Sequence, residues 1–306
     1  MTLRLIALGT IFDKYIGTDP LFLARFPNAM AAYSLRALRA ESYKSPIVRI
    51  RRDDNVTQDF YLSGSEVSTS EVMSFVGAMS GYVETLYDQS GNGQHASQAV
   101  QTRQPKIVDA GNPVLSGGRL ALKFDGADDY LDIPATIART LGTASQDFSV
   151  LFCCQPHAAN ASFNPLSLAS KGSPDNTSNL LLFQANTTFL DAPKSAGALV
   201  RTSSTTKYTR SNNGNQIGVV AAAVLRTGGN ATTYDALSAG APSEFSQPAL
   251  GLELATMGAL RRGINAIPEA QNPGSTVLEL IVYSRSMQVD IMQMMTDLTS
   301  YYRPAG

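Results

Sequence analysis

The chain has 306 residues, of which 43% are hydrophobic and 16% charged, and its formal net charge is −1. Because lysine and arginine are spread along the chain and form no basic face, this composition excludes a typical nucleic-acid-binding protein. No apolar run approaches the roughly 18 residues of a transmembrane helix, and the N-terminus lacks the features of a signal peptide, so we expect no membrane insertion and synthesis in the cytoplasm.

The first part of the chain predicts an arm followed by two helices and two strands. Residues 1–28 are apolar and aromatic without a clear period, so they are expected to bury their side chains against the domain or another subunit. Residues 29–41, AMAAYSLRALRAE, predict a helix with Asn28 as its N-cap. The sequence therefore predicts a docking arm, 1–28, and one domain, 29–306. The next predicted elements are strands at 46–51 and 57–62 and a helix at 69–79.

Residue 82 begins a region of short strands separated by clusters of Gly, Asn, Pro and Ser. Many short strands with turn chemistry between them are typical of an all-β sandwich. The adjacent Cys153 and Cys154 fall in one strand, where free cysteines behave as small core residues. The predicted strands are 82–87, 105–108, 120–125, 129–133, 147–155, 178–184, 197–203, 217–225, 231–236, 251–257 and 277–283.

The chain ends in a predicted helix, 286–302. Its apolar side chains recur at helical spacing, so they form one face that is expected to pack against the sandwich. These side chains are Met287, Ile291, Met294, Leu298 and Tyr301.

The segment LYDQSGNGQHASQ gathers turn-forming residues after a predicted strand. Its acid and hydroxyl can bond backbone N–H groups two residues on, and its glycines supply positive φ angles. A turn that fixes an edge of the sandwich therefore explains the motif without a substrate. The motif residues are Asp88, Gln89, Ser90, Gly91, Asn92, Gly93 and His95.

A catalytic triad is the alternative for this loop. It would use Asp88, Ser90 and His95. Residues this close on one loop rarely reach the required geometry, and the strand–turn–helix context of a GxSxG nucleophile is absent. We therefore favour the turn.

Three acids in FDGADDYLDI form a candidate cation site. Asp125, Asp128 and Asp129 offer several oxygens, the ligand type that Ca²⁺ prefers. The Asp125-Gly126 pair also predicts a tight hairpin between two strands, and this interpretation is favoured. We expect neither a bound metal nor another cofactor.

Aromatic and amide side chains near the middle of the chain are candidate carbohydrate contacts. They are Tyr208, Asn212, Asn213 and Tyr234. The alternative is that they are ordinary exposed residues of hairpins. The chain contains no Trp, a residue that frequently packs against sugars.

The segments AAYSLRALRAESYKSPIVRIRR, TQDFYL, FVGAMSGYVETLYDQSGNGQHASQ and RQPKIV occur in this order in the first half. They resemble the catalytic-domain opening of the α-L-arabinofuranosidase B family. They are also similar to related concanavalin A-like (LamG-type) domains of bacteriophage tail and other virion proteins. LALKFDGADDYLDI and TVLELIVYSRSMQVDIMQMMTDLTSYY are similar to later, more generic elements of such domains. The resemblance covers about residues 29–302. It implies a concanavalin A-like jelly-roll β-sandwich with short N-terminal helices and a C-terminal helix.

The resemblance also implies where catalytic residues would lie. Enzymes of the family carry a nucleophilic Glu on a strand in the middle of the sandwich and an acid/base Asp in a Gly-Gly-Asp-Asn-like loop before the penultimate strand. The corresponding segments here are 178–191, which has no Glu, and 257–270, which has no Asp. We therefore assign no catalytic residue and expect no intact hydrolase site.

The function implied by the resemblance is a structural protein of a bacteriophage virion, in the tail, tail tip or baseplate. Its expected partners are other virion subunits through residues 1–28, further copies of itself in a homo-oligomer, and a host-surface glycan. Its expected location is the virion, assembled in the host cytoplasm. The alternatives are a glycoside hydrolase of the α-L-arabinofuranosidase type and a free-standing carbohydrate-binding module.

Overall fold

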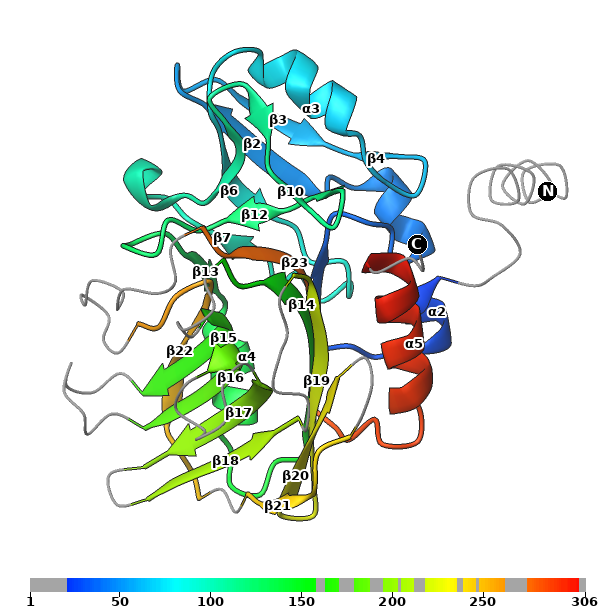
Figure 1. Cartoon of the computed structure of the whole chain (residues 1–306), viewed down its shortest axis with the longest axis vertical. Helices are drawn as coiled ribbons and strands as arrows, with labels where there is room; N and C mark the ends of the chain where they lie inside the picture. Colours follow the sequence, from blue (N-terminus) through cyan, green and yellow to red (C-terminus); the bar gives the residue numbers. More distant parts are fainter. Residues whose placement is uncertain are drawn as a thin grey trace, which may run out of the picture.

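The computed structural model describes residues 21–157, 163–170, 179–187, 195–202, 205–211, 218–235, 239–245, 248–261 and 274–302. Within these ranges the strands pair antiparallel and form a β-sandwich, one outer face of which carries helices (Figure 1). This architecture confirms the predicted all-β sandwich. None of the helices in the described ranges is long and apolar enough to span a membrane.

The back sheet of the sandwich has the strand order β20–β19–β14–β23. β1 and β12 both pair with β23, and β21 pairs with β20. The strands are β1 (Ala31–Ser34), β12 (Leu122–Lys123), β14 (Phe148–Gln155), β19 (Val220–Thr227), β20 (Asn230–Asp235), β21 (Ser243–Glu244) and β23 (Thr276–Tyr283).

The front sheet has the strand order β18–β17–β16–β15–β22–β13–β7. Figure 1 shows several of its strands opposite β14 and β19 of the back sheet. The strands are β7 (Ala96–Ser97), β13 (Leu131–Ile133), β15 (Phe163–Ser170), β16 (Leu180–Thr187), β17 (Ser195–Arg201), β18 (Thr206–Arg210) and β22 (Leu252–Met257).

The strand β6 (Gly81–Leu86) joins the two sheets. It pairs with β7 of the front sheet at one end and, at the other end, with β8, which pairs with β12 of the back sheet. β2 and β3 extend the array on the other edge of β6. The remaining strands are β2 (Val48–Arg52), β3 (Thr57–Phe60), β4 (Leu62–Ser63), β5 (Glu66–Val67), β8 (Lys106–Asp109), β9 (Asn112–Pro113), β10 (Leu115–Ser116) and β11 (Arg119–Leu120).

The helices lie at the ends and on the back of the sandwich. The predicted helix at 69–79 is present as α3, although Gly77, with a φ of 64°, ends it early. Ser68 caps it by accepting a hydrogen bond from the Glu71 amide. The described helices are α2 (Phe22–Arg25), α3 (Thr69–Val76), α4 (Ala135–Leu141) and α5 (Ile291–Tyr302), with 3₁₀ turns η1 (Ala40–Lys44) and η2 (Gln101–Arg103).

Apolar side chains form a main core between the sheets and a second core between the back sheet and α5. Neighbouring residues of a back-sheet strand therefore face different cores. Cys153 belongs to the second core and Cys154 to the main one, and both are buried thiols that form no disulfide, as predicted. The predicted apolar stripe of the C-terminal helix is also confirmed, because Met294 and Leu298 are fully buried against the back sheet.

The predicted helix at 29–41 is wrong. Residues 31–34 form β1, which pairs with β23 and is buried on both faces. Asn28, the predicted N-cap, has a φ of 65° and caps no helix. Alanine-rich sequence favours a helix, but a strand whose two faces contact two cores gains more from burial than helix propensity can supply.

The last residues of the predicted docking arm lie in the second core. Phe22 and Phe26 of the segment 21–28 pack edge to face there and are buried. This part of the arm therefore belongs to the domain. Residues 1–20 lie outside the described ranges, so the docking role of the arm stays a prediction.

Candidate functional site

The segment LYDQSGNGQHASQ forms a loop that is held through Asp88. One carboxylate oxygen, Oδ1, accepts hydrogen bonds from the amides of Ala32 and Ser90 at 2.9 and 2.8 Å. The other, Oδ2, accepts from the Ser90 hydroxyl and the Gln94 amide. Asp88 is thus fully engaged in joining the loop to β1, and it has no oxygen left for a Ser–His–Asp relay.

The other polar side chains of this loop also bond the backbone. Gln89 bonds the main chain of residues 34, 36 and 38, and the Asn92 amide donates to the carbonyls of residues 29 and 30. His95 accepts a hydrogen bond from the Asp88 amide, which occupies its Nδ1. Gly91 and Gly93 have the positive φ angles, 92° and 69°, that the turn requires. These contacts describe a structural turn that fixes the chain between α2 and η1.

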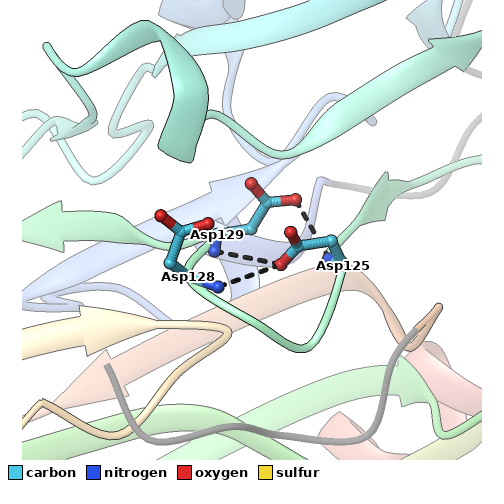
Figure 2. A group of neighbouring side chains, drawn as sticks. All are labelled: Asp125, Asp128 and Asp129. Carbon is cyan, nitrogen blue, oxygen red and sulfur yellow. Dashed lines mark hydrogen bonds between the residues drawn. The ribbon is translucent and has the colours of Figure 1, made fainter. Parts of the chain in front are cut away.

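The three acids of FDGADDYLDI lie together in a tight connection between β12 and β13 (Figure 2). Their closest oxygens all lie within 4.8 Å of one another. Asp125 accepts three backbone hydrogen bonds through Oδ1, and Asp129 accepts the Asp125 amide through Oδ2. The arrangement has the bonds of the predicted hairpin. The remaining carboxylate oxygens are the ones that a cation would use.

Asp129 is the buried member of this group. Burial, followed by the charge of Asp125, raises the pKa of Asp129 from its usual 3.8 to about 7. Asp128 is more exposed and forms an ion pair with Arg103 at 3.5 Å. The group therefore changes its charge near neutral pH.

Asp129→Asn is expected to stabilise the protein at pH 8 by on the order of 2 kcal/mol and to have no effect near pH 4. The pKa of Asp129 is raised in the folded state, so its contribution to stability is complete below about pH 4 and is lost as the pH rises through about 7. Asparagine keeps the acceptor for the Asp125 amide and carries no charge. Urea unfolding at pH 4 and pH 8 measures the effect. If Asp129→Asn raised the free energy of unfolding equally at pH 4 and pH 8, the buried charge of Asp129 could not be the cause.

The two candidate tyrosines lie on opposite outer faces of the sandwich. Tyr208 pairs with Leu199 on the outer face of the front sheet and is 41% exposed. Tyr234 pairs with Ala223 and packs against the second core. The structure therefore does not bring the two predicted contacts together. The other two predicted contacts, Asn212 and Asn213, lie outside the described residues.

One line of directly paired residues crosses ten strands, from β3 to β18. Directly opposed residues of antiparallel strands point to the same side of a sheet, and these point away from the main core. We call this side the front face. The row is Asp59, Arg49, Thr85, Ser97, Asp132, Thr256, Ser167, Leu182, Leu199 and Tyr208.

The centre of the front face carries buried polar side chains that the sequence analysis missed. Asn164 and Ser167 come from β15, Gln184 from β16 and Thr256 from β22, and each is 3% exposed or less. The Gln184 amide nitrogen donates to Asn164 Oδ1 at 2.9 Å. Ser167 Oγ and Gln184 Oε1 are buried and have no hydrogen-bond partner within the described ranges. The sequence signals are weak: Ser167 stands between two leucines in LSLAS, and Gln184 follows four apolar residues in LLLFQAN.

Asp132 is the carboxylate nearest the centre of the row. It forms an ion pair with Arg261 at 2.9 Å, and its side chain is 49% exposed. Burial raises the pKa of Asp132, and the charge of Arg261 opposes that rise. The guanidinium of Arg261 also lies over the Tyr130 ring, 5.4 Å from its centroid.

The described parts of the two segments that the sequence resemblance relates to catalytic positions both reach the front face. Segment 178–191 includes β16, whose polar side chain at the centre of the face is Gln184, where no Glu occurs. Segment 257–270 is described only as far as Arg261. Its described residues add Leu260 and Arg261 to the front face and no carboxylate.

The fold is similar to those of solved arabinofuranosidase and sialidase structures. An arabinofuranosidase complexed with arabinofuranosyl-α-1,2-xylobiose aligns with a TM-score of 0.59 and 16% identity, over 92% of this chain and 64% of that one. A variant GH54 α-L-arabinofuranosidase soaked with 4-nitrophenyl α-L-arabinofuranoside aligns with a TM-score of 0.55 and 17% identity, again over 92% of this chain and 64% of that one. A Trypanosoma rangeli sialidase in complex with 2,3-difluorosialic acid aligns with a TM-score of 0.50 and 10% identity, over 97% of this chain and 38% of that one. No protein-family model and no curated protein matches the sequence.

At these identities the similarity establishes the fold. It confirms that the predicted resemblance to the arabinofuranosidase sandwich holds in three dimensions. The chain spans about 64% of the length of the arabinofuranosidases that it matches. The predicted bacteriophage origin is not tested by these structures.

Proposed function

We propose that this chain binds glycans through the front face and does not cleave them. The observation that carries the proposal is Tyr208, an exposed ring on the outer face of the front sheet, at the end of the row that also contains Ser167 and Thr256. Sugar rings present C–H groups on their faces and hydroxyls at their edges. A tyrosine ring can pack against the former, while hydroxyl and amide side chains bond the latter. The similar structures, which hold sugars or sugar analogues, support this choice.

Binding is favoured over hydrolysis because the front row lacks a carboxylate pair. Retaining glycosidases hold two carboxylates about 5 Å apart, and inverting ones hold them less than about 10 Å apart. The two acids of the row, Asp59 and Asp132, are separated by four strand spacings, about 19 Å along the sheet. Asp132 is also held by Arg261.

Hydrolysis is the second candidate, because one carboxylate pair does have a suitable spacing. Asp125 and Asp129 have oxygens within 4.8 Å, and the pKa of Asp129 is raised to about 7. Their backbone hydrogen bonds favour a structural role, so we expect no release of 4-nitrophenol from 4-nitrophenyl α-L-arabinofuranoside. Release by the wild type that is lost in Asp129→Asn would establish a hydrolase instead.

Tyr208→Ala is expected to weaken glycan binding at least tenfold, because it removes the exposed ring of the front face. The measurement is binding to a panel of immobilised neutral oligosaccharides that includes arabinofuranosyl-α-1,2-xylobiose, followed by titration calorimetry on the best binder. Tyr234→Ala is the matched control, since this tyrosine lies on the opposite face. If the wild type binds no member of the panel, or if both variants bind equally well, the proposal fails.

The virion role stays a prediction beside this function. A glycan-binding sandwich would suit a host-attachment protein of a bacteriophage tail, assembled in the host cytoplasm and docked to other subunits or copies of itself through the predicted arm, residues 1–28. The similar structures support the two alternatives to the virion role, a glycoside hydrolase and a carbohydrate-binding module, because they are an arabinofuranosidase and a sialidase. Detection of the chain in purified virions by mass spectrometry would test the virion role separately.

A further inference from the structure

We propose that Ser167 and Gln184 form the hydroxyl-binding centre of the front face, an assignment that rests on the proposed glycan-binding function. Both residues are almost completely buried, at 2% and 3% exposure. Ser167 Oγ and Gln184 Oε1 nevertheless have no hydrogen-bond partner among the residues that the structure describes. Buried polar atoms in folded proteins almost always have one, so two such atoms on one face point to a bound group that completes them.

The strand register brings these two atoms close together. Ser167 lies directly opposite Leu182, and Gln184 follows two residues later along β16 on the same face. Diagonal neighbours of this kind have Cβ atoms roughly 7 Å apart. One sugar ring is therefore wide enough to bond both side chains, once it displaces the residues that cover these strands and keep both atoms out of contact with solvent.

The chemistry of the pair selects a hydroxyl-bearing ligand. The Gln184 amide nitrogen is already bonded to Asn164, which fixes the amide and leaves its carbonyl oxygen as an acceptor. The Ser167 hydroxyl can both donate and accept. Together they offer two acceptors and one donor, which matches two neighbouring hydroxyls of a neutral sugar.

Stability measurements on the ligand-free protein test whether Ser167 and Gln184 lack a partner within the protein. Ser167→Ala is expected to leave the midpoint of thermal unfolding unchanged or to raise it, because the hydroxyl is buried without a partner. Ser149→Ala is the matched control. This buried strand serine donates to the Arg285 carbonyl and accepts the Met287 amide, so its loss lowers the midpoint by several degrees. Equal losses in the two variants would overturn the assignment.

The side-chain amide of Gln184 can be tested by the same comparison of thermal unfolding midpoints. Gln184→Met is expected to lower the midpoint less than Gln104→Met. Gln104 is equally buried, and its amide accepts from Arg51 and donates to the carbonyl of residue 98. If the two variants lose the same stability, Gln184 has a second partner within the protein and the assignment is wrong.

Binding measurements test whether a sugar hydroxyl bonds these two side chains. The probe is arabinofuranosyl-α-1,2-xylobiose or, if another neutral oligosaccharide of the panel binds the wild type more tightly, that sugar. Ser167→Ala and Gln184→Met are each expected to raise its Kd roughly 3- to 10-fold, the effect of one lost hydrogen bond. A deoxy analogue that lacks the corresponding sugar hydroxyl should have its Kd for the wild type raised by the same factor. The variants should bind this analogue no more weakly than they bind the parent sugar.

The outcomes separate the assignment from the function on which it rests. Wild-type binding that survives unchanged in Ser167→Ala and Gln184→Met overturns the assignment and leaves glycan binding intact. Absence of any glycan binding by the wild type overturns both. Additive losses from the deoxy analogue and the variants would show that the sugar hydroxyl contacts another part of the protein, which also overturns the assignment.

Discussion

Glu279→Gln is expected to destabilise the protein by about 3–5 kcal/mol, because it removes one partner of a buried ion pair. Glu279 is 1% exposed and accepts two hydrogen bonds from the Arg36 guanidinium, at 2.8 and 2.9 Å. The variant leaves the Arg36 charge in the interior with Asp297 as its remaining acidic partner. Urea unfolding at neutral pH measures the loss.

The Arg36–Glu279 pair connects four separate parts of the chain. Arg36 follows β1, Glu279 lies in β23, and the guanidinium also lies 5.6 and 4.6 Å from the ring centroids of Phe22 and Tyr301. The Tyr302 hydroxyl donates to Glu279 at 2.9 Å. Burial, followed by the Glu279 carboxylate, raises the pKa of Tyr302 well above its usual value, so Tyr302 remains a donor. The cost of the substitution therefore extends beyond one ion pair.

A surface pair of the same geometry provides the control. Arg49 and Asp59 also form two hydrogen bonds, both of 2.8 Å, but their side chains are 39% and 26% exposed. Asp59→Asn should cost about 1 kcal/mol or less. The double variant Arg36→Met/Glu279→Leu should recover part of the loss, since it leaves no unpaired charge. Equal losses in Glu279→Gln and Asp59→Asn would contradict the role given to burial.

Asp88→Ala is expected to destabilise the protein by about 3–5 kcal/mol. It removes the acceptor of four hydrogen bonds and leaves three backbone amides, those of Ala32, Ser90 and Gln94, without their partner. Because the Ala32 amide belongs to β1, the loss should also loosen the attachment of β1 to the loop. Denaturant unfolding measures the stability, and amide hydrogen exchange at the three positions locates the change.

Ser90→Ala is the graded control for Asp88. It removes one of the four bonds, from the Ser90 hydroxyl to Asp88 at 2.7 Å, together with a weaker one from the Asn92 amide at 3.2 Å. A loss of about 1 kcal/mol is expected. If Asp88→Ala costs no more than Ser90→Ala, the carboxylate does not hold the loop in the way that its hydrogen bonds indicate.

Sequence reasoning predicted the sandwich well because its signals are local. Alternation and turn chemistry located most strands, and helical spacing located α5 from Met287 onward, a few residues before its first helical residue, Ile291. It missed β15 (Phe163–Ser170), β18 (Thr206–Arg210) and α4 (Ala135–Leu141). β15 contains Pro165, which argues against a strand, although a register shift between Phe163 and Leu166 accommodates it.

The candidate site could not be predicted to the same degree, because it depends on strand register. The row from Asp59 to Tyr208 joins ten strands in an order that differs from their order in the chain. No local pattern relates Ser167 of β15 to Thr256 of β22, even though the two are directly paired. Tyr208 was predicted from its residue type, whereas Ser167 and Gln184 emerge only from burial and missing partners.

The position of α2 beside α5 determines which face of the domain stays accessible when the domain is attached to a surface. Figure 1 shows α2 beside α5. Leu21 and Tyr301 line one cavity of about 480 Å³ on the back of the sandwich, and Arg25 forms an ion pair with Asp297 there. The two ends of the described chain therefore emerge together, on the side away from the front sheet. Surface coupling through an exposed residue of α5 would therefore leave the row from Asp59 to Tyr208 on the side of the sandwich away from the support.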